Sequence, residues 1–230
     1  MGNQGLASYF NFSTVNWHDL YTATWQTIWM TLVSMILVTI IGIVLGLILF
    51  ESSQKNGIGY RILNGVVSFL VNVFRSIPYI ILIVLLLPMT KDLVGTIIGP
   101  KAALPSLIIS AAPFYARMVE SDFHEIDHGV IDAVKSMGAN NWDLIWKVIL
   151  PESTPALISG ATVTTISLIS YTAMAGAIGA GGLGNLAYLD GFQSNNNSVT
   201  LAATVVILIF VFIVQFVGDF FARRTDKRAM

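Results

Sequence analysis

The chain has 230 residues, of which 55% are hydrophobic and only 11% are charged, whereas soluble domains carry about a quarter charged residues. This composition excludes an ordinary water-soluble domain. A formal net charge of −1, with no basic run interleaved with aromatic residues, argues against nucleic acid as a partner, and the lack of cysteine excludes disulfides and thiolate metal sites.

The apolar residues are grouped into five long blocks. A helix needs about 20 mostly apolar residues to cross the hydrocarbon core of a bilayer. We therefore predict an all-α, polytopic membrane protein with one domain over residues 1–230 and five transmembrane helices. The predicted spans are 22–50, 61–88, 103–121, 154–178 and 198–221.

The distribution of lysine and arginine predicts the orientation. With five spans the termini lie on opposite sides, so nine basic residues share the face of the C-terminus and two lie on the other. Because cytoplasmic loops are enriched in Lys and Arg, we expect the N-terminus outside and the C-terminus in the cytoplasm. The nine are Lys55, Arg61, Arg117, Lys135, Lys147, Arg223, Arg224, Lys227 and Arg228, and the two are Lys91 and Lys101.

The second span contains Arg75, the one charge well inside a predicted membrane helix. An arginine at mid-helix costs about 2.5–3.5 kcal/mol to insert, so it should face protein or water. Two interpretations stay open: Arg75 binds carbonyls freed by Pro78, or it lines a solute path. A polar stripe lies one or two turns earlier and comprises Asn64, Ser68 and Asn72.

Residues 122–151 are too polar to span the membrane and are patterned for two short helices. Apolar residues of the first recur every three or four positions: Val130, Ala133, Val134 and Met137. Gly138 is suited to a left-handed cap that ends this helix. Acidic residues disfavour docking on anionic lipid, so a protein partner suits the segment better.

The second short helix is expected to be capped by Asn141 and to stop at Pro151, with Ser153 or Thr154 capping the fourth span. Its apolar stripe is Trp142, Ile145, Trp146 and Ile149.

Two motifs in the sequence have simpler interpretations than the sites they suggest. Gly179, Gly181 and Gly184 have the G-x-G-x-x-G spacing of dinucleotide loops, but they close a membrane helix rather than join a strand to a helix. His124 and His128 have the i, i+4 spacing of some zinc sites, but a solvated surface role is favoured. With no triad or intramembrane carboxylate pair, we expect a non-catalytic chain.

One stretch resembles the cytoplasmic EAA loop of ABC importer permeases: Asp132–Val134, three intervening residues, Gly138, nine intervening residues, and Val148–Pro151. Asp132, Val134 and Val148 stand where that pattern has Glu, Ala and Ile. Asp127 stands where we expect proline, which leaves the start of the docking helix open.

Further segments resemble the methionine-importer permease family, and the likeness extends from the first helix to residues 215–219. These segments are Phe74–Pro78, Ala111–Phe114, Ala116–Glu120, and Ala173–Met174 leading into Gly179–Gly184.

The resemblance implies a multi-pass subunit of the bacterial plasma membrane. It would form a homodimer that binds two cytoplasmic ABC ATPase subunits and receives solute from an external methionine-binding lipoprotein. ATP and Mg would be bound by the ATPase, with no cofactor or metal in this chain. The implied ATPase-docking coupling helix comprises Val130, Ile131, Asp132, Ala133, Val134, Met137 and Gly138.

The resemblance also places Met174 where side chains of two subunits narrow the path. A gate at Met174 and ordinary helix packing are both open, because methionine fills gaps readily. We expect a permease for L- and D-methionine, with Met174 and Arg75 on its path. Alternatives are the same mechanism for another amino acid or peptide, a secondary transporter, and a membrane adaptor without transport.

Overall fold

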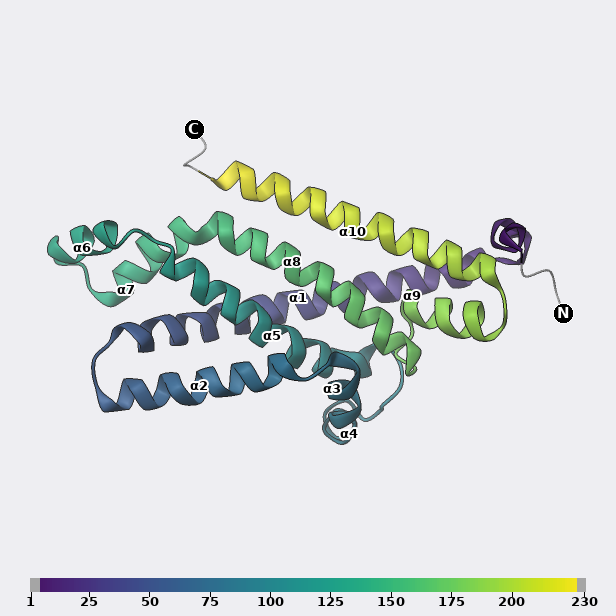
Figure 1. The fold of residues 1–230 in the computed structure, drawn as a ribbon, viewed down its shortest axis with the longest axis horizontal. Coiled ribbons are helices and arrows are strands. Elements are labelled where there is room, and N and C mark those ends of the chain that lie inside the picture. The colour runs from purple at the N-terminus through teal and green to yellow at the C-terminus, as the bar shows by residue number, and fades with distance from the viewer. Residues whose placement is uncertain (1–4, 227–230) are drawn as a thin grey trace.

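The computed structural model describes residues 5–226, and every regular element within this range is a helix. Lys227 and Arg228, counted above for orientation, lie outside the described residues. The long helices form one elongated bundle with the two termini at opposite ends (Figure 1). In the described part, four continuous helices are long and apolar enough to cross a membrane, and there are five spans if one bent pair of helices is counted as a single span. The predicted all-α fold is confirmed.

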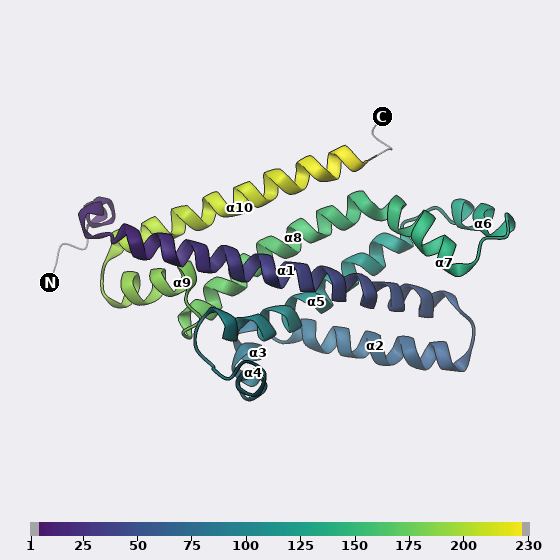
Figure 2. The ribbon, with the colours of Figure 1, turned by 180° about the vertical axis from the view of Figure 1, so that it is seen from behind.

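Helix α1, Trp17–Gln54, begins at Asn16, whose side chain accepts a hydrogen bond from the His18 amide. At 1.5 Å per residue its 38 residues extend about 57 Å, well beyond a hydrocarbon core of about 30 Å. Helix α5, Pro100–His124, crosses it closely (Figure 2). Gly42 and Gly46 of α1 lie directly against Tyr115 and Val119, as small residues allow between membrane helices.

The second span is broken, and its prediction as one continuous helix over 61–88 is wrong. Helix α2, Ile58–Ser76, ends before Pro78, and α3, Tyr79–Leu85, leaves it at 106°. Proline disfavours a helical conformation for the residue before it, and Ile77 is accordingly extended. Helix α4, Leu87–Val94, follows α3.

Helix α8, Leu150–Ala177, packs between α5 and the last helix, α10, Asn197–Thr225. The buried Tyr115 hydroxyl of α5 donates a 3.0 Å hydrogen bond to the Leu157 carbonyl of α8. On the other side, Gly218 of α10 lies against the Thr162 side chain. These contacts hold α5, α8 and α10 together.

The predicted turn at the glycines is confirmed, but it leads into helix rather than loop. After α8 ends, α9, Gly182–Asn185, and a π-helical segment, η4, Leu186–Gln193, run back towards α10. Gln26 and Thr27 of α1 accept hydrogen bonds of 2.8 Å from the amides of Gly182 and Leu183. Polar backbone that leaves a helix inside lipid needs such partners, because no water is available.

Short 3₁₀ turns, η1, Leu6–Phe10, and η2, Phe12–Thr14, precede α1 and lie against the start of α10. Asn197 donates to the Ser8 hydroxyl at 2.8 Å, and Ser198 donates to the Ser8 carbonyl at 2.9 Å.

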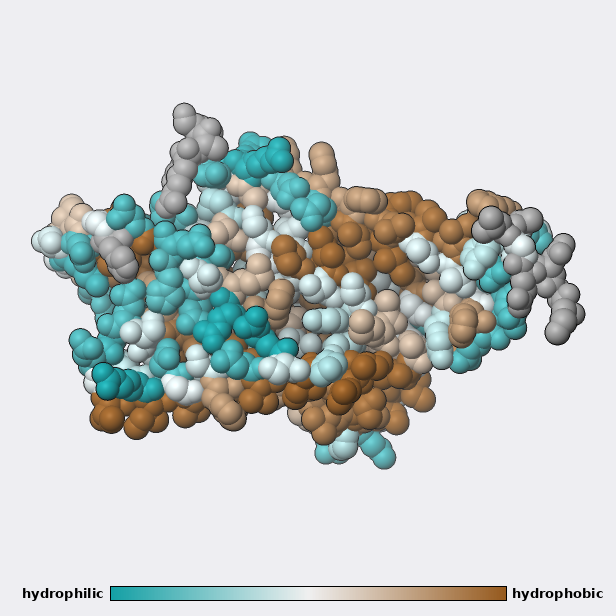
Figure 3. All heavy atoms as spheres, viewed as in Figure 1, coloured by the Kyte–Doolittle hydropathy of each residue, from teal (hydrophilic) through white to brown (hydrophobic). Residues whose placement is uncertain are grey.

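The surface separates by polarity. Hydrophilic residues gather over the end that carries the loop between α5 and α8, and hydrophobic residues cover α10 and the outer side of α2, α3 and α4 (Figure 3). Exposed apolar side chains of α2 and α10 include Ile62, Val66, Phe69, Leu208, Phe212 and Phe216. Such faces suit lipid or another apolar helix.

We expect Gly184→Ala to destabilise the fold by about 1–3 kcal/mol, because a Cβ there would overlap the backbone of Ala173. Thermal unfolding of the purified, detergent-solubilised chain measures this. Gly65→Ala on α2 is the matched control, since nothing lies within 4 Å of its Cβ position. Equal melting temperatures for both variants would contradict close packing between α8 and α9.

Candidate functional site

The loop between α5 and α8 contains the predicted coupling helix. Helix α6, His128–Ser136, begins at Asp127, whose carboxylate accepts a 2.7 Å hydrogen bond from the Gly129 amide. Asp127 thus marks the helix start that the sequence left open. Gly138 has φ +86°, the left-handed conformation predicted for the cap.

The second half of the loop differs from its prediction. Asn140 rather than Asn141 caps α7, Asn141–Leu144, and accepts a 2.8 Å hydrogen bond from the Asp143 amide. The chain then continues as one helix to Ala177.

Pro151 does not stop this helix, and neither Ser153 nor Thr154 caps a new one. The preceding turn is π-helical, η3, Ile145–Ile149, and the Leu150 amide donates to the Ile145 carbonyl. A wider turn changes which carbonyl each amide faces, so a residue without an amide hydrogen is accommodated. Thr154 donates to the Leu150 carbonyl within the helix.

The predicted docking residues point in two directions. Ile131 is 3% exposed and belongs to a core cluster that includes Phe50 of α1 and Phe123 of α5, with Val134 packed against it. By contrast, Met137 is 87% exposed. Asp132, Ala133 and Gly138 are exposed, as is Val130. One face of the loop therefore packs against the bundle, and the other face points outward.

The outward face extends beyond the predicted residues to Trp142 and Trp146. Both indoles are exposed, and their ring centroids lie 5.6 Å apart. The sequence predicted that the two tryptophans share one face of a helix, but the direction in which this face points is set by the packing of α7. Together, Val130, Ala133, Met137, Gly138, Trp142 and Trp146 form what we call the loop face.

The loop also contacts the end of α1. A small pocket of about 80 Å³ lies between them, lined on the α1 side by Phe50, Glu51 and Lys55. The hydrogen bond from Lys55 to Glu51 raises the pKa of the Lys55 ammonium above its ordinary value.

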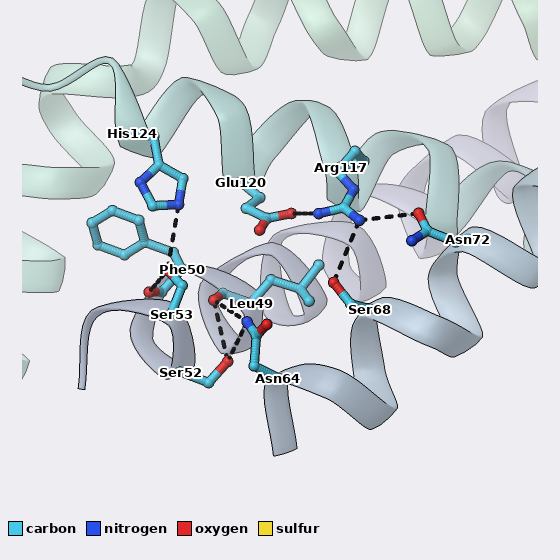
Figure 4. A network of polar contacts seen from close by, with 10 residues as sticks. All are labelled: Leu49, Phe50, Ser52, Ser53, Asn64, Ser68, Asn72, Arg117, Glu120 and His124. Atoms are coloured by element: carbon cyan, nitrogen blue, oxygen red, sulfur yellow. Dashed lines mark hydrogen bonds and ion pairs between the residues drawn. The ribbon is translucent and has the colours of Figure 1, made fainter. Parts of the chain in front are cut away.

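The polar stripe on α2 contacts α5 and α1. Arg117 of α5 donates to Glu120 at 2.5 Å, to Asn72 at 3.0 Å and to Ser68 at 3.4 Å (Figure 4). Asn64 donates to the Leu49 carbonyl at 3.1 Å. The stripe thus fastens α2 to α5 and α1.

Arg117 and Glu120 were missed as a functional pair, although their i, i+3 spacing was visible in the sequence. Glu120 is only 8% exposed, and a buried carboxylate needs a partner of opposite charge.

Arg75 does not belong to this network. It lies exposed in the last turn of α2, and within residues 5–226 its guanidinium makes no hydrogen bond or ion pair. The interpretation in which Arg75 binds backbone carbonyls freed by Pro78 is wrong for the single chain. Arg75 remains available to a second subunit or to water.

Met174 lies on an exposed stripe of α8 and is itself 45% exposed. From Ser153 to Ala177 the exposed residues of α8 are Ser159, Val163, Ser170 and Met174. At 3.6 residues per turn these four fall within about 60° of one another. Two serines on an otherwise covered membrane helix favour contact with water or a second subunit over lipid.

The two histidines do not share one helical face. His124 ends α5, with its Nε2 3.4 Å from the Ser53 hydroxyl, and His128 opens α6. Among the described residues, no group of three or more His, Asp or Glu could hold a metal ion.

Comparisons with known proteins agree with this architecture. A family model described as "Binding-protein-dependent transport system inner membrane component" matches residues 58–228. The methionine import system permease protein MetP of Bacillus subtilis is 58% identical over 217 residues, covering 94% of this chain and 98% of that protein. The probable D-methionine transport system permease protein MetI of Pasteurella multocida is 45% identical over 184 residues, covering 80% and 85%.

Among solved structures, an inward-facing conformation of the MetNI methionine ABC transporter superposes with a TM-score of 0.89 at 42% identity. The match covers 92% of this chain and 98% of that one.

We expect Arg117→Leu to destabilise the fold by about 1–3 kcal/mol, because it leaves the buried Glu120 carboxylate without its partner. Adding Glu120→Leu should recover part of this loss. A double-mutant cycle on thermal unfolding measures the coupling. Strictly additive losses would show that Arg117 and Glu120 do not stabilise the fold as a pair.

Proposed function

Since the chain belongs to the family of binding-protein-dependent transport system inner membrane components, we propose that it is the membrane-spanning subunit of an ATP-driven methionine importer. It is a non-catalytic permease of one domain over residues 1–230. The observation that carries this proposal is the loop face, which leaves apolar side chains and Gly138 uncovered at the polar end of the bundle.

Methionine is favoured over another small amino acid because the relatives covering most of the chain are named for methionine. Substrate-dependent uptake by proteoliposomes, with and without an ATPase partner, tests this function. Uptake without the ATPase would instead support a secondary transporter.

Two exposed surfaces, the stripe of α8 around Met174 and the loop face, point to the partners of the chain. The exposed stripe of α8 around Met174 would face the same stripe of a second copy across the solute path. Two ABC ATPase subunits, which would hold ATP and Mg, would bind the loop face of each protomer. A methionine-binding lipoprotein would deliver solute at the opposite end. We place the N-terminus outside and the C-terminus in the cytoplasm, on the side of the basic residues.

The core supplies a mechanical connection between these surfaces. Ile131 packs in the same buried cluster as Phe123 of α5, and the Phe50 and Phe123 rings are 5.6 Å apart. Tyr115 then joins α5 to α8, the helix that carries Met174. Movement of the ATPase against α6 would therefore move α5 and α8 together. Alternating access would be a rigid-body change between two states that the ATPase binds differently.

We expect Gly138→Val to weaken ATPase association about 5–30-fold, because a left-handed conformation costs a non-glycine residue about 1–2 kcal/mol. Co-purification with the ATPase and ATP-dependent uptake measure the effect. Gly138→Asn is the matched control, since asparagine tolerates this conformation and should retain most binding. Undiminished association of the valine variant would contradict docking through this turn.

At the proposed solute path, Met174→Ala should lower methionine uptake per ATP hydrolysed by about fivefold or more. This factor corresponds to the lower end of the coupling free energies usual between two sites. The reason is loss of a flexible thioether from the constriction. Leu208→Ala, an exposed position on the apolar face of α10, should leave this ratio unchanged. If both variants transport normally, Met174 is not a gate.

A further inference from the structure

A largely apolar groove of about 400 Å³ lies between α1 and the start of α5 and has no role in the proposed mechanism. The starts of α1 and α5 lie at the end of the bundle away from α6 (Figure 2), and the residues that line the groove belong to these segments and to the loop before α5. Its lining comprises Trp25, Gln26, Trp29, Thr96, Ile98, Gly99, Pro100 and Lys101.

Hydrogen bonds hold both walls of the groove in place. On the α1 wall, Gln26 accepts the Gly182 amide. On the other wall, the Gly99 amide donates a 2.9 Å hydrogen bond to the Gly179 carbonyl. The Thr96 hydroxyl accepts a 3.1 Å hydrogen bond from the Ile98 amide. Both walls are therefore fastened to the glycine turn after α8, and the groove exists without a ligand.

The rim of the groove combines two features of a membrane interface. Trp25 is 61% exposed and Trp29 is partly buried, and indole rings favour the level of lipid headgroups. Lys101 is exposed and, in the part of the chain that the structure describes, forms no ion pair or hydrogen bond. A cation beside an apolar groove at this depth complements an anionic headgroup whose acyl chain lies in the groove.

We propose that this groove binds an anionic phospholipid of the outer leaflet, with an acyl chain on Trp25, Trp29, Ile98 and Pro100 and the phosphate beside Lys101. The assignment to the outer leaflet depends on the orientation given under the proposed function, whereas lipid binding in the groove does not depend on it. Because both walls are tied to the glycine turn, the bound lipid stabilises the corner where α8 ends.

The test is retention of dioleoyl phosphatidylglycerol by the purified, detergent-solubilised transporter, measured by native mass spectrometry and by thermal stability. Lys101→Gln should weaken retention about fivefold, the factor expected for one lysine beside anionic lipid. Trp25→Ala should weaken it as well. Lys91→Gln, which changes the other basic residue assigned to the same side, is the matched control and should retain lipid as the parent does.

Three results would overturn the proposal: equal losses for Lys101→Gln and Lys91→Gln, equal retention of phosphatidylcholine, or equal stabilisation by inorganic phosphate alone. None of these readouts depends on uptake or ATP hydrolysis. A chain that fails to transport methionine but keeps selective lipid retention would refute the proposed function and leave this site standing.

Discussion

The absence of water from the bilayer interior is the constraint on which this structure depends. Each backbone amide and carbonyl at membrane depth needs a partner within the protein, and four long continuous helices supply most of them. Where the chain departs from a regular helix at the glycine turn, side chains compensate: Gln26 and Thr27 accept hydrogen bonds from the amides of this turn.

The same constraint decides where polar side chains lie. In lipid, apolar surface provides little drive for helices to associate, so small residues and hydrogen bonds hold them together. Gly42 and Gly46 bring α1 against α5, Arg117 fastens α5 to α2, and Tyr115 fastens α5 to α8. Helix α5 is therefore the hub. Under the proposed function, a force on the loop between α5 and α8 would reach α8 through this hub and not only through the chain connection.

Features set by neighbouring residues could be predicted from the sequence. The periodicity of α6 and the left-handed cap at Gly138 are of this kind. Features that depend on distant partners could not. The stripe on α2 suggested a path, but Asn72 meets Arg117, which lies 45 positions away in the chain. A local rule also failed at Pro151, because proline ends a regular α-helix but not one that widens beforehand.

The central claim is that α6 moves as one body with α1 and α5 and thereby moves α8. Because the chain contains no cysteine, spin labels can be placed at Gln54→Cys with Ser136→Cys, and separately at Ser159→Cys in both protomers. Double electron–electron resonance is recorded on the transporter with a cysteine-free ATPase, with and without ATP. The account predicts an unchanged distance between α1 and α6 and a changed distance between the two α8 helices. A shift of α6 relative to α1, with the α8 distance constant, would contradict it.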